Sequence, residues 1–261
     1  MSGFTGPDHY QKFFDPKIYL ETYFRLAGDS MGDDLLHFIL KNLAQIFNSG
    51  NVKGETLIDI GTGPSIHHLL SACNAFKNII VSDFTDRNRE EFQAWLSNKS
   101  TIFDWSPILK HVCQLEGGRI PWAEKEDSLR RAVTQVLKCD ILKSNPTDPV
   151  ELGQADCVLS CLCLESVCKD EEDYIAALNN ISTLLKPGGH LVLAGALGNT
   201  FYTVGAVRFS ALPVTDDFIK QSLIAIGYDI ISVELFQKPE GCVEDIADFT
   251  AHYVLLARKR A

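Results

Sequence analysis

The stretch Leu57-Ile58-Asp59-Ile60-Gly61-Thr62-Gly63-Pro64 decides the fold that this sequence predicts. An apolar, β-prone run ends in two glycines separated by one residue, and Pro64 is a favourable first residue for a helix. Gly61 and Gly63 can take backbone angles closed to other residues, and they have no side chain to keep a ligand away. A helix over 64–76 would add unpaired N–H groups. The stretch therefore predicts a strand, a tight turn and a helix that together hold a nucleotide-like ligand.

The turn departs from the fingerprint of dinucleotide-binding proteins at one position. That fingerprint has a third glycine, which brings helix and strand together around a pyrophosphate, and this chain has Ile66 there. The departure favours a nucleoside without a pyrophosphate over NAD. A glycine turn can also be purely structural, so the residues downstream of it decide between a binding turn and a packing turn.

An acidic residue ends the next β-branched run. Asp83 lies about 20 residues after Gly61, the spacing at which a carboxylate accepts hydrogen bonds from both ribose hydroxyls. Asn88, in the first turn of a helix predicted over 86–96, is near enough in sequence to share the ribose. Asp83 and Asn88 are therefore candidate ribose ligands, although such an acid standing alone is more often a solvated strand end.

A second acid, Asp140, ends a third apolar run. It can accept a hydrogen bond from an exocyclic amine of a base while Ile141 packs on the ring. In this order and spacing the acids resemble the S-adenosylmethionine (SAM) site of a Rossmann-like methyltransferase. The segment LLKPGGHLVL at 184–193 resembles the helix end, PGG turn and fifth strand of that superfamily. We expect an α/β fold with a seven-stranded, mostly parallel sheet and helices on both faces.

Composition fits one domain. The 261 residues are 46% apolar and 22% charged, which is ordinary for a globular protein. We expect a single domain over 1–261, with an N-terminal lid and helices in 1–50 and a hairpin insertion over 198–213. The hairpin should turn near Gly205 and sit where a substrate cap would lie. Elsewhere, periodicity predicts helices over 33–47, 122–137, 170–185 and 215–226, and strands over 156–163, 229–236 and 252–258.

Net charge and cysteine content limit the partners and the cellular compartment that the sequence predicts. A net charge of −10 disfavours nucleic acid, because phosphate binding needs clustered lysine and arginine. No apolar run reaches the roughly 18 residues of a membrane span, and the start lacks the features of a signal peptide. The eight cysteines lie mostly inside apolar runs, as buried thiols do in a reducing compartment. We expect a cytoplasmic monomer without a metal or a disulfide framework.

The first 25 residues are unusually aromatic. Tyr19 and Tyr23, four residues apart, share a face of a short helix that Pro16 can open. A packed arm explains most of these rings. As a lid, the same rings would shield a cationic sulfonium, attract it through their quadrupoles and exclude water.

The chain resembles, nearly end to end, the vertebrate small-molecule N-methyltransferases that act on nicotinamide, indolethylamine (or thioethers) and phenylethanolamine. The shared stretches are specific and include GFTGPDHYQKFFDPKIYLETYF at 3–24, LIDIGTGPSI at 57–66, SDFTDRNREE at 82–91 and LLKPGGHLV at 184–192. The resemblance implies SAM as the methyl donor. The positions that it places on the cofactor are Tyr10, Tyr19, Gly61, Thr62, Gly63, Asp83, Asn88, Asp140 and Ile141.

Three cofactor positions differ from the family. Phe24 and His67 stand where the family has tyrosines, and Cys161 stands where it has a threonine or a similar residue. The first two changes alter a polar contact to the methionine end, which affects affinity more than the identity of the cofactor.

The substrate positions differ more. Gly195 stands where nicotinamide methyltransferases have an aspartate, and Ala211 where they have a serine. Gly198 replaces a glutamate of the phenylethanolamine enzymes, whereas the segment around Tyr202 is similar to theirs and Glu165 matches their other acid. Indolethylamine methyltransferases lack both acids and accept many amines. The resemblance therefore favours a broad N-methyltransferase of small aromatic, tryptamine-like amines.

Methyl transfer from a sulfonium is an in-line displacement, which mainly requires alignment and exclusion of water. An alkyl amine must also lose a proton, so Glu165 at the end of the fourth strand, or a carboxylate of a late acidic loop, can act as the base. A pyridine nitrogen needs none. Glu244 of the acidic loop is a candidate substrate contact. Two alternatives remain: a nicotinamide N-methyltransferase that makes 1-methylnicotinamide, and a protein that binds SAM with little or no turnover.

Overall fold

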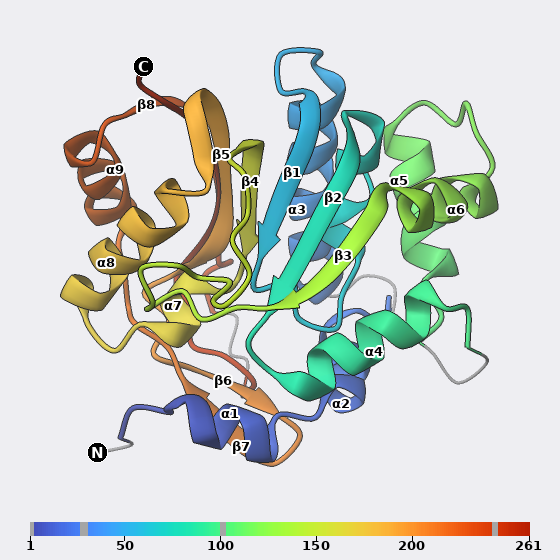
Figure 1. Ribbon diagram of the computed structural model, residues 1–261. Helices are drawn as coiled ribbons and strands as arrows, with labels where there is room; N and C mark the ends of the chain where they lie inside the picture. The colour runs from blue at the N-terminus through green and yellow to red at the C-terminus, as the bar shows by residue number, and fades with distance from the viewer. Residues whose placement is uncertain (1–2, 27–30, 100–102, 242–244) are drawn as a thin grey trace.

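A seven-stranded sheet forms the centre of the computed structural model, which describes residues 3–26, 31–99, 103–241 and 245–261 (Figure 1). The strand order is β3-β2-β1-β4-β5-β9-β8. The first five of these run parallel, and β9 pairs antiparallel with both β5 and β8. The predicted mostly parallel sheet is confirmed. Its strands are β1 (Gly54–Ile60), β2 (Phe76–Asp83), β3 (Val133–Lys138), β4 (Ala155–Cys161), β5 (Leu185–Leu197), β8 (Tyr228–Gln237) and β9 (Ala251–Lys259).

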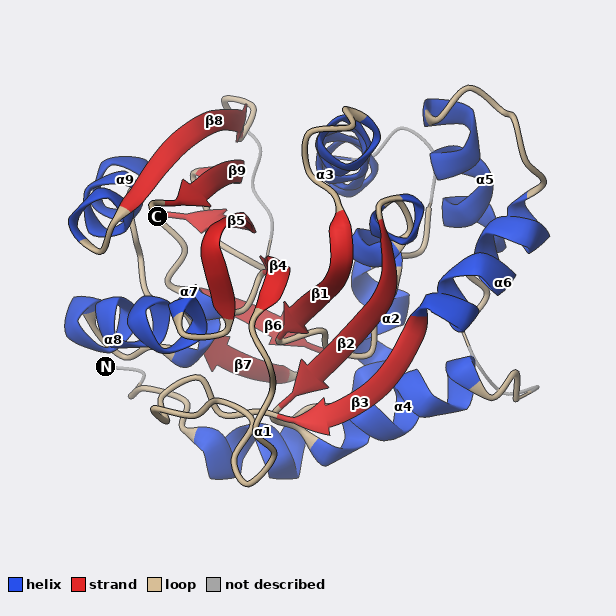
Figure 2. Cartoon of the chain, turned by 45° about the horizontal axis from the view of Figure 1, so that its top comes forward, coloured by secondary structure: helices blue, strands red, loops and turns tan. Residues whose placement is uncertain are grey.

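Helices cover both faces, as expected from apolar runs whose alternate residues point to opposite sides (Figure 2). Leu57 of β1 faces one core cluster and its neighbour Ile58 faces the other. The first face carries α3 (Met31–Asn48), α4 (Asp86–Leu96), α5 (Ser106–Leu115) and α6 (Trp122–Ala132). The second carries α7 (Leu164–Val167), α8 (Glu171–Ser182) and α9 (Asp216–Ala225). None of these described helices is long and apolar enough to cross a membrane.

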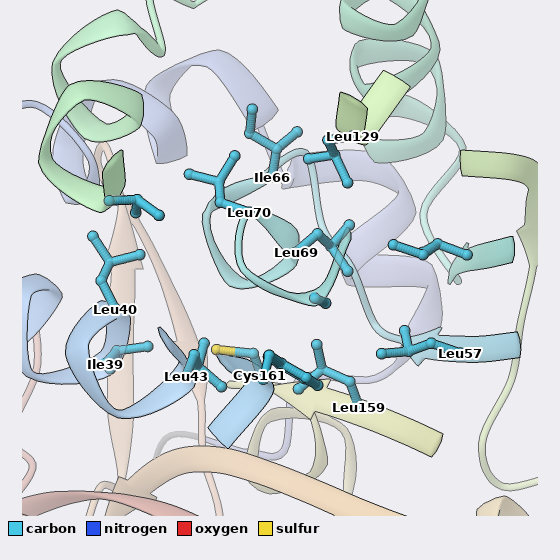
Figure 3. Close-up of a cluster of buried hydrophobic side chains, with 14 of the residues drawn as sticks. Ile39, Leu40, Leu43, Leu57, Ile66, Leu69, Leu70, Leu129, Leu159 and Cys161 are labelled. Atoms are coloured by element: carbon cyan, nitrogen blue, oxygen red, sulfur yellow. The ribbon is translucent and has the colours of Figure 1, made fainter. Parts of the chain in front are cut away.

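The core on the first face is built from leucine-rich contacts between α3 and the sheet. Leu43 of α3, Leu159 of β4 and Leu57 of β1 belong to one buried cluster, and all three are labelled in Figure 3. All three side chains are essentially inaccessible to solvent. Full burial of one such side chain stabilises the fold by about 1.5–3 kcal/mol. This packing holds the ends of β1 and β4 in a fixed relation to each other.

The N-terminal helices and a hairpin lie along the carboxyl edge of the sheet (Figure 1). The helices are α1 (Pro7–Phe13) and α2 (Pro16–Tyr23), and the hairpin consists of β6 (Phe201–Val204) and β7 (Val207–Ser210). Asp15 caps α2 by accepting from two backbone N–H groups of its first turn. The hairpin turns at Gly205, whose φ of +59° suits glycine. The predicted hairpin and its turn are confirmed.

The predicted helix over 64–76 is wrong. The chain makes two 3-10 turns instead, η1 (His67–Leu69) and η2 (Ala72–Asn74). Every residue from Pro64 to Ala72 is buried, so the segment has no solvent face of the kind an amphipathic helix needs. Because no α-helix begins at Pro64, the glycine turn itself remains the candidate contact to a ligand.

Two further elements differ from prediction. The helix predicted over 122–137 ends at Ala132, and Val133 begins β3, because the β-branched segment VTQVLK pairs with β2. Helix α5 was not predicted at all. Its buried residues Ile108, Leu109 and Val112 follow a helical period directly after Pro107, which stands in the first turn.

Candidate active site

A cavity of about 370 Å³ opens at the carboxyl ends of the strands, where ligands of open α/β sheets bind. It brings together every predicted cofactor residue, together with Glu165 and Tyr202. The cofactor residues that line it are Tyr10, Tyr19, Phe24, Gly61, Thr62, Gly63, His67, Asp83, Asn88, Asp140, Ile141 and Cys161. Gly195, Gly198 and Ala211 are not part of its lining. Glu244 lies outside the described residues.

Asp83, the last residue of β2, forms the centre of a polar cradle. Its carboxylate accepts from the N–H of Gly63 at 2.8 Å, the N–H of Thr85 at 2.8 Å and Asn88 Nδ2 at 3.1 Å. Burial raises the pKa of this carboxyl, and these three hydrogen bonds partly offset the effect. The Oδ1 atom of Asn88 is buried and accepts no hydrogen bond from the described residues. The cradle thus offers acceptors to a pair of hydroxyl donors, as a ribose requires.

The glycine turn allows a close approach of chain segments at this cradle. Gly61 has a φ of +72°, and a Cβ atom there would lie 2.2 Å from Cys163 Sγ. Only glycine fits both the angle and the space. Its N–H and that of Thr62 both donate to the carbonyl of Ser82, which ties the turn to β2.

The far side of the cradle carries Asp140 and Ile141. The Asp140 carboxylate accepts from the N–H of Leu142 at 3.1 Å and keeps further lone pairs for a ligand. Ile141 is buried and lines the same wall. An acid beside an apolar side chain can accept from an exocyclic amine while the side chain covers the ring. The polar cradle at Asp83 and the wall formed by Asp140 and Ile141 together fit the adenosine part of SAM.

A buried chain of polar groups reaches the cavity from the other side. Asp59 Oδ2 lies 2.8 Å from His68 Nε2, and His68 Nδ1 lies 3.4 Å from His67 Nδ1. The Asp59 carboxylate accepts from His68 Nε2–H, and one proton is shared in the contact between the two Nδ1 atoms. Burial lowers the pKa of His67 well below its usual range. The His67 ring is therefore neutral, and its Nε2 lies 3.8 Å from Cys161 Sγ.

Aromatic rings from the N-terminal arm and the hairpin close the cavity. The Tyr202 hydroxyl donates to the Tyr10 hydroxyl at 3.0 Å, and Tyr10 donates to the Ser166 carbonyl at 3.2 Å. Phe209 is completely buried and its ring centroid lies 4.8 Å from that of Tyr10. The packed-arm interpretation of these rings is thus correct for the conformation described.

Glu165 is the buried acid of the site. It is 2% exposed, lines the cavity and accepts from the N–H of Ala196 at 2.9 Å. Burial raises its pKa to about 7, against which the Ala196 hydrogen bond acts. A carboxyl with a pKa near neutrality can take up and release a proton during turnover.

Neighbouring side chains fill the space beside both glycines that the sequence marks at the substrate end. A Cβ atom on Gly195 would lie 2.9 Å from Glu165 Oε1 and 2.8 Å from the Tyr253 hydroxyl. Gly198, at a φ of +62°, is packed against Thr250 in the same way. The missing side chains therefore accommodate Glu165, Tyr253 and Thr250, and neither glycine marks an opening in the cavity.

Sequence reasoning missed some residues of the cavity wall, notably Leu162, Phe249 and His252. His252 lies in an apolar strand, where a histidine is more often a packing residue, so its spacing carried no functional signal. Its place on the wall depends on the pairing of β9 with β5.

The NNMT/PNMT/TEMT family model matches residues 2–260. The chain belongs to this family. It is 44% identical over 259 residues to nicotinamide N-methyltransferase of Homo sapiens, covering 99% of this chain and 97% of the relative. It is also 44% identical over 259 residues to indolethylamine N-methyltransferase of Oryctolagus cuniculus, covering 99% and 98%. The chain is therefore a SAM-dependent N-methyltransferase, and its equal similarity to both relatives does not choose between their substrates.

A solved structure shows the same fold at much lower sequence similarity. The chain superposes on the magnesium protoporphyrin IX methyltransferase of Synechocystis with bound SAM at a TM-score of 0.60 and 14% identity. The match covers 98% of this chain and 95% of that one. It supports a class I methyltransferase fold.

Proposed function

We propose that this family member methylates the nitrogen of small aromatic amines, with the broad, tryptamine-like range of an indolethylamine N-methyltransferase. The observation that carries the proposal is Glu165, a buried carboxyl on the cavity wall whose pKa lies near 7. An alkyl amine is protonated at neutral pH and must lose a proton to expose its lone pair. A pyridine nitrogen does not, so a buried base is needed for amines rather than for nicotinamide.

In this proposal, residues of the chain bind and orient the cofactor and the amine and shield both from water. Asp83 and Asn88 hold the ribose hydroxyls, and Asp140 with Ile141 holds the adenine. Bound SAM supplies an electrophilic methyl group. Glu165 accepts the amine proton directly or through one water. Alignment of two reactants in this way contributes several kcal/mol, up to about 10.

The N-terminal arm acts as a lid in this proposal. Gln11 Nε2 donates to the Phe84 carbonyl at 3.1 Å, which fixes α1 beside the ribose cradle. Thr5 and Ser210 exchange hydrogen bonds that fix the arm to the hairpin. These contacts hold the rings over the cavity while water is excluded. The arm, sheet and hairpin thus work as one catalytic domain.

Nicotinamide is the second candidate substrate, favoured by the 44% identity to the human nicotinamide enzyme. The carboxamide would then need a partner other than residue 195, because Glu165 and Tyr253 fill the space beside Gly195. The Tyr253 hydroxyl is not part of the cavity lining and lies 3.4 Å from the Tyr174 hydroxyl in a buried pair.

Replacement of the proposed base tests the function. Glu165→Gln should lower tryptamine turnover by about 100-fold or more, because the proton acceptor is lost, and should leave SAM affinity unchanged. In the native protein kcat/KM for tryptamine should rise with pH through about 7, the pKa of Glu165, and the variant should lose this step. Glu171→Gln, on the exposed first turn of α8, is the matched control. Unchanged tryptamine turnover in Glu165→Gln would remove this residue from the mechanism.

A further inference from the structure

His252 is a further polar side chain of the cavity wall, and it takes no part in the proton transfer proposed for Glu165. His252, on β9, is 5% exposed and forms part of the cavity wall. Its Nδ1 is buried and has no hydrogen-bond partner among the residues that the structure describes. Leaving a buried nitrogen unpaired costs free energy. A leucine or valine at this position would pack without that cost, so the imidazole requires an explanation other than packing.

The surroundings of His252 are apolar. Its ring packs edge to face on Phe249, with centroids 4.4 Å apart. Phe249 belongs to a small buried cluster with Ala196 and Ala247, on which Leu35, Leu162 and Tyr202 pack. Burial lowers the pKa of His252 to about 3, so the ring is neutral at pH 7. A neutral imidazole has one donor and one acceptor nitrogen, so it suits an uncharged polar partner.

His252 lies close to the proposed base along the sheet. Ala196 of β5 is its direct partner in the antiparallel pairing with β9, and the N–H of the same Ala196 donates to Glu165. The acid and the imidazole therefore flank one residue of the cavity wall. The cofactor cradle lies farther away at the end of β2, four strand positions from β9 and thus about 19 Å along the sheet. His252 belongs to the substrate end of the cavity.

We propose that His252 Nδ1 hydrogen-bonds a hydroxyl or amide group on the aromatic ring of the substrate, at the end remote from the amine. This inference rests on the proposed function and narrows it to amines whose ring carries such a group. A ring hydroxyl suits the site whichever nitrogen holds the proton, because a hydroxyl both donates and accepts. Phe249 and Leu162 would then contact the apolar faces of the ring.

Matched ligands that differ only in the ring hydroxyl test the proposal by binding, independently of turnover. Calorimetry on the protein saturated with S-adenosylhomocysteine would compare phenylethylamine with its 3-hydroxy and 4-hydroxy derivatives. The native protein should bind one hydroxylated amine about tenfold more tightly than phenylethylamine. His252→Leu should abolish that preference and leave phenylethylamine affinity within about twofold. His252→Gln, which keeps a donor and an acceptor, should restore part of the preference and serves if the leucine variant folds poorly.

The outcomes separate this inference from the function on which it rests. A preference of equal size in native protein and in His252→Leu would overturn the inference, and so would the absence of any preference in the native protein. If amines bind with the predicted preference but never gain a methyl group, the proposed function fails and the His252 contact stands. Methylation of phenylethylamine and both hydroxylated amines at equal kcat/KM, with equal affinity, would retain the function and reject the role of His252.

Discussion

The Asp83 carboxylate accepts from the N–H of Gly63 in the glycine turn, and one substitution tests its role. Asp83→Asn keeps the shape of the side chain but replaces acceptors that a ribose needs with a donor. Hydrogen bonds to charged groups contribute about 1.5–3 kcal/mol, so the dissociation constant for SAM should rise about tenfold or more in calorimetry. Asp86→Asn, three residues away and exposed, is the control. Equal affinity losses in both variants would contradict a specific ribose contact.

The raised pKa of Glu165 also predicts a pH-dependent cost to stability. The Glu165 carboxyl has a pKa of about 7 in the folded protein, compared with 4.5 for an unperturbed glutamate. Its folded pKa exceeds its unfolded pKa, so the native protein loses stability as pH rises from about 4.5 through 7. Glu165→Gln should therefore raise the free energy of unfolding by up to about 3 kcal/mol at pH 8 and by almost nothing at pH 4.5. Urea denaturation at both pH values measures this, and a pH-independent difference would argue against a buried ionised carboxylate.

Phe209 is a fully buried ring in the contact between the N-terminal arm and the hairpin. Phe209 of β7 packs against His9, Tyr10, Phe14 and Tyr202. Phe209→Ala should release the arm, because truncation of a buried phenylalanine costs about 3–5 kcal/mol. Hydrogen exchange over α1 and α2 should accelerate while β1 and β4 stay protected. Phe201→Ala, on the same hairpin but partly exposed, should change exchange much less. Uniform acceleration across the sheet would instead mean that the arm is part of the core.

The elements that the sequence predicts well are those whose pattern is local. The helix over 86–96 and the hairpin turn at Gly205 are confirmed, because an amphipathic period and a glycine turn are visible within a few residues. The segment over 64–76 misleads because all of its residues from Pro64 to Ala72 are buried, so its apolar content says nothing about its period. Helix α6 ends at Ala132 and Val133 begins a strand, because the segment that follows pairs with β2. That pairing cannot be seen in the sequence of the segment itself.

The same contrast holds for the cavity. Asp83 and Asn88 are predictable, since one strand end and the following helix place both of them. His252 is not, because it reaches the cavity through the antiparallel pairing of β9 with β5. Gly195 shows the difference most directly. From sequence it suggests an empty position, whereas in the fold Glu165 and Tyr253 occupy the space.

For the whole molecule, we propose that cofactor and substrate bind at the two ends of one cavity along the carboxyl edge of the sheet. The ribose cradle is at β2, the proposed base is on α7 and the proposed substrate contact is on β9. The order β2-β1-β4-β5-β9 keeps these parts in sequence across the sheet. The arm and hairpin then cover both ends together.

The most direct test of the proposed function is methyl transfer from labelled SAM, with the products identified by mass. Tryptamine, tyramine, phenylethanolamine and nicotinamide would be offered in parallel. We expect N-methylated amines as the main products, formed faster than 1-methylnicotinamide. Binding of SAM without any methylated amine, or nicotinamide as the dominant acceptor, would contradict the proposed function.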